Sequence, residues 1–228
     1  MGKRIVVTGL GAVTPLGIGV DAFWEGMTSG RSGIREIQHF DTSRLAVRIA
    51  GEVPDFVPGD FMDAKAAKRM DRFAQFGVAA ARQAIDDAGL AITDENRERV
   101  GVMMNTGGGG IMTIETNIVA MEQHGPGRVS PFLIPMFAPN MASSQVSISL
   151  GIKGPTITSV AACAAGVQAF VDAVHVLQRG DDDVLVSGGT EAGLSPVSIS
   201  GLENMRALST PSSARRSASI RPACSPDR

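Results

Sequence analysis

The residue best placed to act as a nucleophile in this sequence is Cys163. It lies in the run 161–166, Ala-Ala-Cys-Ala-Ala-Gly, where a β-rich stretch gives way to a helical pattern. At the start of a helix, unpaired N–H groups and the helix dipole favour the thiolate over the thiol. The same N–H groups can stabilise the oxyanion that forms when a thiolate attacks a thioester. The small neighbouring side chains leave room for an acyl chain to reach the sulfur.

A cysteine among alanines is more often a buried structural residue, and a cysteine nucleophile usually needs a histidine nearby. The chain has three histidines, His39, His124 and His175. His175 is twelve residues further along the predicted helix, which places it about 18 Å along the axis from Cys163. His39 and His124 lie in polar or proline- and glycine-rich surroundings and are expected to be exposed in loops. The sequence therefore contains a candidate nucleophile without an evident base.

Two glycine-rich segments are only superficially similar to nucleotide-binding loops. The segment 9–14, Gly-Leu-Gly-Ala-Val-Thr, follows the first predicted strand, but Pro15 and Gly17 break the chain before a helix could begin. We therefore interpret it as a tight turn at the end of a strand rather than a nicotinamide site. The run 107–110 consists of four glycines and lacks the Lys-Ser/Thr pair of a P-loop. Its expected use is close approach to another element or to an elongated ligand.

A cluster of basic residues precedes the longest predicted helix. Lys65, Lys68 and Arg69 are spaced so that a helix would bring them close together. Such a cluster is most often a solvated helix face, but it could also receive an acidic partner. Both interpretations stay open on the residues alone.

The hydrophobic pattern indicates a layered α/β fold. Short β-rich runs that do not alternate are separated by stretches of helical periodicity, a pattern typical of strands buried on both faces. The predicted strands are 3–8, 100–105, 156–160 and 184–187, and the predicted helices are 71–88, one from Asn140 to Gly151, and one that begins near Cys163 and ends at Gly180. Between His124 and Asn140, four prolines exclude a helix interior or a central strand, so we expect an ordered loop.

The composition limits the possible classes of function. The 228 residues are 43% hydrophobic, enough for a substantial core, and the net charge of −2 provides no basic field for nucleic acid or anionic lipid. Two cysteines are too few for a disulfide framework, which favours a reducing compartment. No segment has the apolar stretch of a signal peptide or the roughly 20 apolar residues of a transmembrane helix. We expect a cytoplasmic protein that binds neither nucleic acid nor membrane, and we expect no metal site.

The character of the chain changes after Thr210. Residues 211–228 are mainly Ser, Arg, Pro and Ala, and they carry four arginines against one aspartate. A segment of this composition is expected to be disordered, although a basic arm is an alternative. We therefore expect one domain over residues 1–210 and a disordered tail over residues 211–228.

Several short motifs together resemble one family of enzymes. Besides Cys163 with its neighbours, the chain contains Val-Val-Thr-Gly-Leu-Gly at 6–11, Pro-Asn-Met at 139–141, Gly-Ile-Lys-Gly-Pro at 151–155, Gly-Gly-Thr-Glu at 188–191 and Met-Arg-Ala-Leu-Ser-Thr at 205–210. This combination resembles the elongating β-ketoacyl-acyl-carrier-protein synthases of type II, which are condensing enzymes of the thiolase fold. The resemblance implies the N-terminal half of a thiolase-like α/β fold, a mixed sheet flanked by helices. Its last strand would be missing, which leaves an open sheet edge and an apolar face that need a partner.

The resemblance also implies roles for Cys163 and its surroundings. Cys163 would take an acyl group from acyl-carrier protein as a thioester, and the carbanion from a decarboxylated malonyl unit would attack it. No cofactor beyond the phosphopantetheine arm of that carrier is implied, and full-length relatives are expected to be homodimers. The implied acyl-pocket residues are Gly108, Phe132, Leu133 and Leu202, and the implied carrier-docking residues are Lys65, Lys68, Arg69 and Arg206.

The chain also departs from the family pattern. Many relatives carry a bulky apolar residue at the position of Gly108 and a phenylalanine at that of Leu202, so the preferred acyl length stays open. The family's two catalytic histidines and its catalytic lysine belong to a C-terminal half that this sequence does not contain. After Thr210, the expected motifs give way to Pro-Ser-Ser-Ala-Arg-Arg, which resembles out-of-frame translation of a GC-rich gene.

Three functional hypotheses follow from these observations. The first is a condensing enzyme of fatty acid elongation, with polyketide synthesis as the alternative pathway. The second is a truncated, non-catalytic fragment that binds carrier protein or a full-length subunit. The third is a nicotinamide-dependent enzyme that uses the turn at Gly9, for which we expect no cofactor binding.

Overall fold

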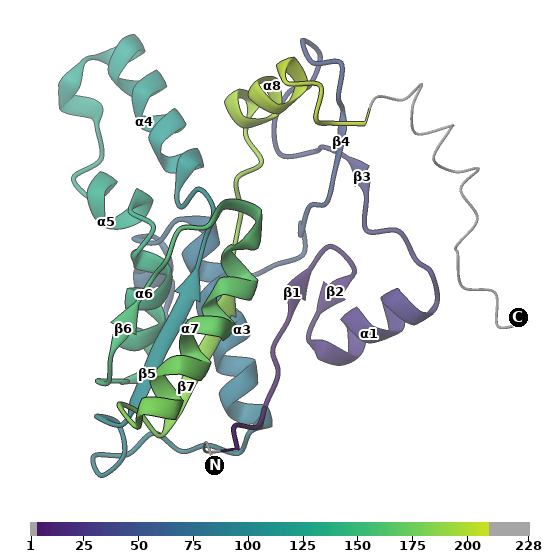
Figure 1. Ribbon diagram of the computed structural model, residues 1–228. Helices are drawn as coiled ribbons and strands as arrows, with labels where there is room; N and C mark the ends of the chain where they lie inside the picture. Colours follow the sequence, from purple (N-terminus) through teal and green to yellow (C-terminus); the bar gives the residue numbers. More distant parts are fainter. Residues whose placement is uncertain (1–3, 210–228) are drawn as a thin grey trace, which may run out of the picture.

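A three-stranded parallel sheet forms the centre of the protein. The structure, a computed structural model, describes residues 4–209 (Figure 1). β5 (Val100–Asn105) lies between β6 (Thr156–Ile157) and β7 (Val184–Gly189), and both neighbours run parallel to it. All six residues of β5 are buried, as the non-alternating pattern predicts for a strand covered on both faces. Three of the four predicted strands are confirmed, with β6 shorter and β7 longer than predicted.

Helices cover both faces of this sheet, so the fold has three layers. α3 (Arg72–Asp87) and α6 (Met141–Leu150) pack on one face, and α7 (Ala165–Arg179) covers the other (Figure 1). Successive residues of β5 point to opposite faces. Val102 belongs to the large core cluster with α3 and α6, whereas Met103 packs against α7. This arrangement confirms the predicted layered α/β class.

The helix boundaries follow local signals in the sequence. Asp71 caps α3, where its carboxylate accepts a hydrogen bond from the N–H of Phe73 at 3.2 Å. α6 ends at Gly151 and α7 ends at Gly180, both in the left-handed region with φ of 72° and 81°. Glycine adopts this conformation without steric cost. The three predicted helices are confirmed to within two residues at each end.

The segment between His124 and Asn140 is more ordered than a loop. It contains a 3-10 turn, η2, and the short helix α5, in which Pro135 falls within the first turn, where proline is tolerated. The bounds of the remaining elements are β1 Val13–Thr14, β2 Gly17–Ile18, α1 Val20–Thr28, β3 Arg35–Glu36, β4 Ile49–Ala50, η1 Pro58–Asp60, α2 Ala64–Ala67, α4 Ile111–His124, η2 Pro126–Arg128, α5 Leu133–Phe137, η3 Ala162–Ala164 and α8 Pro196–Asn204.

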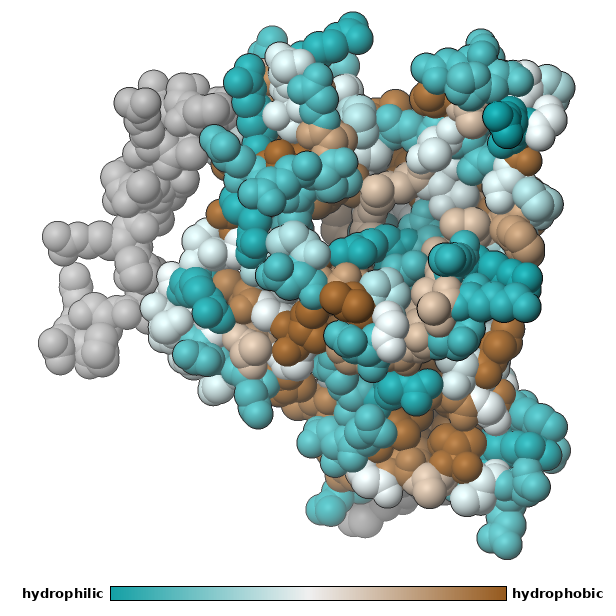
Figure 2. Space-filling view, turned by 180° about the vertical axis from the view of Figure 1, so that it is seen from behind, coloured by the Kyte–Doolittle hydropathy of each residue, from teal (hydrophilic) through white to brown (hydrophobic). Residues whose placement is uncertain are grey.

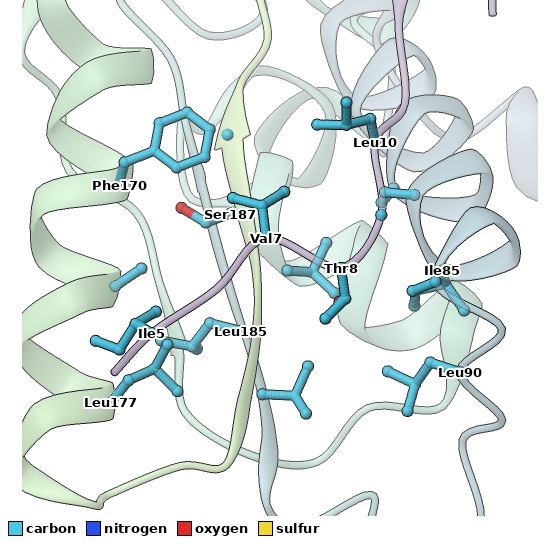
Figure 3. Close-up of a pocket in the computed structure, with 18 of the residues that line it drawn as sticks. Ile5, Val7, Thr8, Leu10, Ile85, Leu90, Phe170, Leu177, Leu185 and Ser187 are labelled. Carbon is cyan, nitrogen blue, oxygen red and sulfur yellow. The ribbon is translucent and has the colours of Figure 1, made fainter. Parts of the chain in front are cut away.

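The predicted strand at 3–8 is wrong for the part that the structure describes. From Arg4 to Ala12 the chain is assigned to no strand, and Val6 and Val7 are 58% and 73% exposed. In Figure 3 this segment crosses β7 from the side of α7 towards α3, and a cavity of about 570 Å³ lined by residues of all four lies between the segment and β7. Across such a gap the backbones cannot form the ladder of hydrogen bonds that defines a strand pair.

Gly9 and Gly11 allow close packing against a helix and do not form the predicted turn at the end of a strand. A Cβ built on Gly9 would lie 2.1 Å from the carbonyl oxygen of Ala84, and one on Gly11 would lie 1.9 Å from that of Ala80. Both glycines therefore let the N-terminal segment lie directly against α3. The turn comes later, in the hairpin formed by β1 and β2.

Apolar side chains on α7 remain exposed, and among the described residues one side of β7 is unpaired. Val167 and Phe170 of α7 are 70% and 54% exposed. Within residues 4–209, β5 is the strand that pairs with β7, and no second strand pairs with its other side. From behind, apolar residues also gather in the lower half of the view (Figure 2). Exposed apolar surface of this kind indicates an interaction with further protein.

Three further sequence-based expectations concern the tail, membrane-spanning helices and metal sites. The tail expected over 211–228 lies outside the described residues. None of the helices between residues 4 and 209 combines the length and the apolar composition that crossing a bilayer requires. In the same range, no group of three or more histidine, cysteine or acidic side chains is arranged to hold a metal ion.

Candidate active site

Cys163 lies on a short turn between the sheet and α7. The turn is η3, which ends directly before the first residue of α7, and the cysteine is exposed. The N–H of Ala164 donates to the carbonyl oxygen of Ala161 at 3.0 Å, which closes the turn around Cys163. The regular helix begins two residues later, so the thiol stands on the entry turn to the helix.

Ala162 adopts a strained backbone conformation beside the thiol. Its φ of 47° lies in the left-handed region, which a residue with a Cβ adopts at a cost of about 1–3 kcal/mol. Such a conformation persists only where the surrounding structure holds it. A sharp turn of this kind between strand and helix is a means of exposing a nucleophile.

The side-chain amide of Asn105 holds this turn from both sides. Its Oδ1 accepts a hydrogen bond from the N–H of Ser159 at 2.8 Å, and its Nδ2 donates to the carbonyl oxygen of Ala165 at 3.1 Å. Ser159 precedes Cys163 by four residues and Ala165 follows it by two, so one side chain spans the nucleophile. Asn105 ends β5 and is only 1% exposed, so water cannot replace these two hydrogen bonds.

Two glycines let neighbouring elements approach the turn. A Cβ on Gly189, the last residue of β7, would lie 2.6 Å from the Cα of Gly166 in α7. A Cβ on Gly107 would lie 3.1 Å from the carbonyl oxygen of Ala162. The glycine run 107–110 therefore lies against the turn that carries the nucleophile, in agreement with the prediction of close approach to another element.

Glu191 binds the start of the glycine run. Its Oε2 accepts hydrogen bonds from the N–H groups of Gly107 at 2.9 Å and Gly108 at 3.0 Å, and from the hydroxyl of Thr106 at 3.2 Å. Successive N–H groups form a concave site for an anion, and the carboxylate fills it. The preceding residue, Thr190, donates its N–H to the carbonyl oxygen of Asn105 at 2.9 Å. The ends of β5 and β7 thus bring Glu191 to the glycine run.

The ring of His39 has a contact at each of its two nitrogens. Its Nε2 lies 2.7 Å from the carbonyl oxygen of Leu194, and its Nδ1 contacts the carboxylate of Glu52. Both partners are hydrogen-bond acceptors. Burial would raise the pKa of Glu52, but hydrogen bonds from the His39 ring and from the N–H groups of Gln38 and His39 outweigh it and lower the pKa. His39 is exposed, as predicted. Its ring connects Glu52 with Leu194, which lie far apart in the sequence.

The other two histidines lie on exposed helix surfaces. His175 is within α7, as predicted, and His124 is the last residue of α4 rather than part of a loop. α4 continues this far because its stop signal, Gly125 with a φ of 84°, comes directly after His124. Neither residue is on the turn that carries Cys163.

The expected acyl-pocket residues come from three parts of the fold. They are Gly108 in the glycine run, Phe132 and Leu133 at the start of α5, and Leu202 on α8. The first two parts meet, because the N–H of Gly110 donates to the carbonyl oxygen of Phe137 in α5 at 2.9 Å. α8 packs instead near β3 and β4, where Ile199 joins a separate core cluster, and Leu202 is 41% exposed.

The expected carrier-docking residues divide into two groups. Lys65, Lys68 and Arg69 lie on α2 and the turn after it, and all three are exposed. The guanidinium of Arg69 lies over the ring of Phe132, 4.8 Å from its centroid. Arg206 is also exposed but follows α8, in a left-handed conformation with φ of 57°.

Comparison with known families decides which family this site belongs to. The profile described as "Beta-ketoacyl synthase, N-terminal domain" matches residues 2–223. The chain belongs to this family. The ketoacyl synthase profile covers the whole of the described structure, including the turn of Cys163, the glycine run and the ends of β5 and β7.

The chain spans about half the length of the relatives that it matches. This ketoacyl synthase domain is 48% identical over 207 residues to a protein from Synechocystis sp. named 3-oxoacyl-(acyl-carrier-protein) synthase 2. The aligned residues make up 91% of this chain and 50% of the relative. Solved structures confirm the thiolase-like fold of the domain. The ishigamide ketosynthase/chain length factor superposes with a TM-score of 0.85 at 30% identity, over 92% of this chain and 52% of that chain.

A third structural match includes a partner protein. It is a type II polyketide synthase acyl-carrier protein in complex with its ketosynthase, with a TM-score of 0.77 at 26% identity, over 92% of this chain and 50% of that chain. A ketosynthase related to this domain therefore binds an acyl-carrier protein.

Two residues of the ketoacyl synthase site escape prediction from the sequence. Asn105 and Glu191 hold the turn and the glycine run through partners that lie between 54 and 85 residues away along the chain. No local spacing rule relates positions so far apart. The one available signal is a polar residue at the carboxyl end of a buried strand, where α/β sheets place their ligand sites.

Proposed function

We propose that this ketoacyl synthase domain supplies the acyl-accepting nucleophile of a 3-oxoacyl-acyl-carrier-protein synthase in fatty acid elongation. The observation that carries the proposal is the exposed Cys163 on a strained turn at the entrance to α7, beside a run of four glycines. The 48% identity to the Synechocystis synthase supports the same conclusion.

The first proposed step transfers an acyl group to Cys163. The thiolate attacks the carbonyl carbon of an acyl thioester on the phosphopantetheine arm of acyl-carrier protein, a C–S bond forms, and the carbonyl electrons move to oxygen. Backbone N–H groups of the turn that carries Cys163 are the proposed donors for this oxyanion. When the tetrahedral intermediate collapses, the original C–S bond breaks and the phosphopantetheine sulfur leaves as a thiolate that takes up a proton.

The second proposed step forms the carbon–carbon bond. A malonyl thioester loses CO₂, and the resulting enolate carbon attacks the acyl group on Cys163, which releases the Cys163 thiolate. By family resemblance, the groups that activate the malonyl unit lie in the half of the relatives that this chain does not span. We therefore propose that the domain alone accepts an acyl group but does not elongate it.

Acyl-carrier protein is the proposed partner. The complex of a related ketosynthase with its carrier protein supports this assignment, and the exposed Lys65, Lys68, Arg69 and Arg206 are the proposed contacts for an acidic surface. The acyl group arrives on the carrier's own phosphopantetheine, so the proposal includes no further cofactor. We also propose that the full-length protein forms a homodimer, because the family resemblance implies one. The small number of cysteines favours a reducing compartment, so we propose a cytoplasmic location.

Gly108, Phe132, Leu133 and Leu202 are the proposed lining of the acyl path. Gly108 supports this role because a Cβ built on it would meet only the carboxylate of Glu191, at 3.8 Å. The space beside Gly108 is therefore open, and a larger residue would narrow it. The proposed acyl path runs along the glycine run to the sulfur of Cys163.

Polyketide synthesis is the second candidate pathway, because one of the structural matches is a type II polyketide synthase acyl-carrier protein in complex with its ketosynthase. Its identity to this domain is 26%, well below the 48% shared with the Synechocystis 3-oxoacyl synthase. Sequence similarity thus favours fatty acid elongation. The acyl groups that the domain accepts would separate the two pathways.

Intact-mass spectrometry of the purified chain mixed with acyl-acyl-carrier protein tests the proposed function. We expect the mass of one acyl group to appear on the chain, to persist in a Cys224→Ser variant and to disappear in Cys163→Ser. Adding malonyl-acyl-carrier protein should yield no elongated product. If saturated acyl groups of every length leave Cys163 unmodified, the non-catalytic binding fragment replaces the proposal.

A further inference from the structure

The shape of the glycine run depends on one carboxylate. The Oε2 atom of Glu191 accepts the N–H groups of Gly107 and Gly108 directly. It also accepts the hydroxyl of Thr106, and that hydroxyl in turn accepts the N–H of Gly109 at 3.1 Å. Three successive glycine N–H groups are therefore oriented by Glu191. Glycine has more backbone freedom than any other residue, so the run has little rigidity of its own.

The glycine run forms a wall between the nucleophile turn and α5. On one side, a Cβ on Gly107 would lie 3.1 Å from both the Ala162 carbonyl oxygen and the Glu191 carboxylate. On the other side, a Cβ on Gly109 would lie 2.7 Å from the carbonyl oxygen of Phe137. The run is thus packed closely at Gly107 and Gly109, whereas a Cβ on Gly108 would meet only Glu191, at 3.8 Å. Loss of the hydrogen bonds to Glu191 would let the run shift into the open space beside Gly108, which the proposed function assigns to the acyl path to Cys163.

We propose that Glu191 is a positioning residue that determines which acyl chain lengths reach Cys163, because it keeps the glycine run clear of the thiol. The inference rests on the proposed function, since it assigns the glycine run as one wall of the acyl path. Glu191 itself does not touch the acyl group or the sulfur in this role. Its effect should increase with the length of the chain that must lie along the run.

Alkylation of Cys163 by two matched reagents tests this inference without any acyl transfer. N-methyl and N-decyl iodoacetamide carry the same reactive carbon, so the ratio of their rates reports on access for a long chain. In a Cys224→Ser background, Glu191→Ala should lower the decyl-to-methyl rate ratio about tenfold, the equivalent of about one lost hydrogen bond. The methyl rate should change less than about twofold, because the exposed sulfur stays accessible.

Three further variants serve as controls. Glu191→Gln keeps an oxygen that can accept the two glycine N–H groups, so it should restore the ratio to within about twofold of the parent. Glu191→Asp shortens the side chain by one methylene and should lower the ratio by less than alanine does. Glu122→Ala removes an exposed carboxylate on α4 that makes no hydrogen bond within the described residues, and the ratio should stay unchanged.

The possible results separate the inference from its alternatives. An unchanged ratio in Glu191→Ala overturns it, and so does an equal fall of both rates, which would reveal a general effect on the thiol. If Glu191→Ala fails to unfold cooperatively, Glu191→Asp decides the question in the same way. Because the reagents act without carrier protein, these results do not depend on whether acyl-acyl-carrier protein labels Cys163.

Discussion

The guanidinium of Arg69 lies 4.8 Å from the centroid of the Phe132 ring. A cation over the face of an aromatic ring is attracted by the ring's negative quadrupole. Arg69 belongs to the basic cluster proposed for carrier docking, and Phe132 directly precedes α5, which borders the glycine run. This contact therefore connects the proposed carrier-docking surface with Phe132, a proposed lining residue of the acyl path.

Replacing Arg69 with alanine should weaken the binding of acyl-carrier protein about three- to tenfold at low ionic strength, because one charge of the docking cluster is lost. The difference from the parent should shrink as salt is added, since exposed charges are screened. Fluorescence anisotropy with labelled carrier protein at two salt concentrations measures both effects. Lys153→Ala removes an exposed lysine outside the cluster, and an equal loss of affinity in that variant would contradict the docking assignment.

Asn105→Ala should lower the free energy of unfolding by about 2–4 kcal/mol, because it leaves two buried backbone groups without partners and opens a cavity. Asn105→Asp retains the acceptor for the N–H of Ser159 but cannot donate to the carbonyl of Ala165 when ionised. Because a carboxylate is costly to bury and would face this carbonyl oxygen, Asn105→Asp should be at least as destabilised as Asn105→Ala near neutral pH. Urea denaturation measures these differences. Asn204→Ala, at the exposed end of α8, is the matched control, and an Asn105→Ala variant as stable as this control would rule out the clamp.

Asp182 makes stability depend on pH. Burial raises the pKa of its carboxyl above the usual 3.8, against the attraction of Arg99, and within the described residues neither carboxylate oxygen accepts a hydrogen bond. The folded state therefore keeps this proton at pH values where the unfolded chain has lost it. Its contribution is complete below the unfolded pKa and is lost as the pH rises through the folded pKa.

Asp182→Asn should accordingly raise the free energy of unfolding by about 1–2 kcal/mol at pH 7, because a neutral amide costs less to bury than a carboxylate. The advantage should shrink as the pH falls and vanish well below the usual pKa of 3.8, where the carboxyl is neutral in both states. Urea unfolding across this pH range measures the difference. Asp86→Asn, at an exposed position of α3, should change the free energy of unfolding by less than about 0.5 kcal/mol at pH 7. An equally small change in Asp182→Asn would refute the prediction.

Gly11→Ala should destabilise the fold by about 1–3 kcal/mol, because the new Cβ would overlap the carbonyl oxygen of Ala80 and force the backbones apart. Gly127→Ala is the matched control, since a Cβ there would meet no atom within 4 Å. Thermal unfolding followed by circular dichroism compares the two variants. Equal midpoints would show that the N-terminal segment does not pack on α3 in solution.

Local patterns were sufficient for the elements whose environment is uniform. β5 is buried over its full length, so its apolar run alone identifies it, and α3 has both a capping aspartate and a clear apolar face. The segment 3–8 has an equally good strand pattern but remains unpaired in the described structure. A strand needs a neighbour at hydrogen-bonding distance, and the residues that could provide one at this edge are not specified by the segment itself.

The sequence by itself determined the layered α/β class, the family resemblance and the identity of Cys163 as the candidate nucleophile, because burial periodicity, helix signals and short motifs are local properties of the chain. Only the tertiary structure decided that Asn105 spans the turn of Cys163, that Glu191 holds the glycine run and that Arg69 lies over Phe132. Each of these contacts joins residues more than fifty positions apart. The contacts of Asn105 and Glu191 exist because the sheet order places the end of β5 beside the ends of β6 and β7, and that order depends on which surfaces pack together.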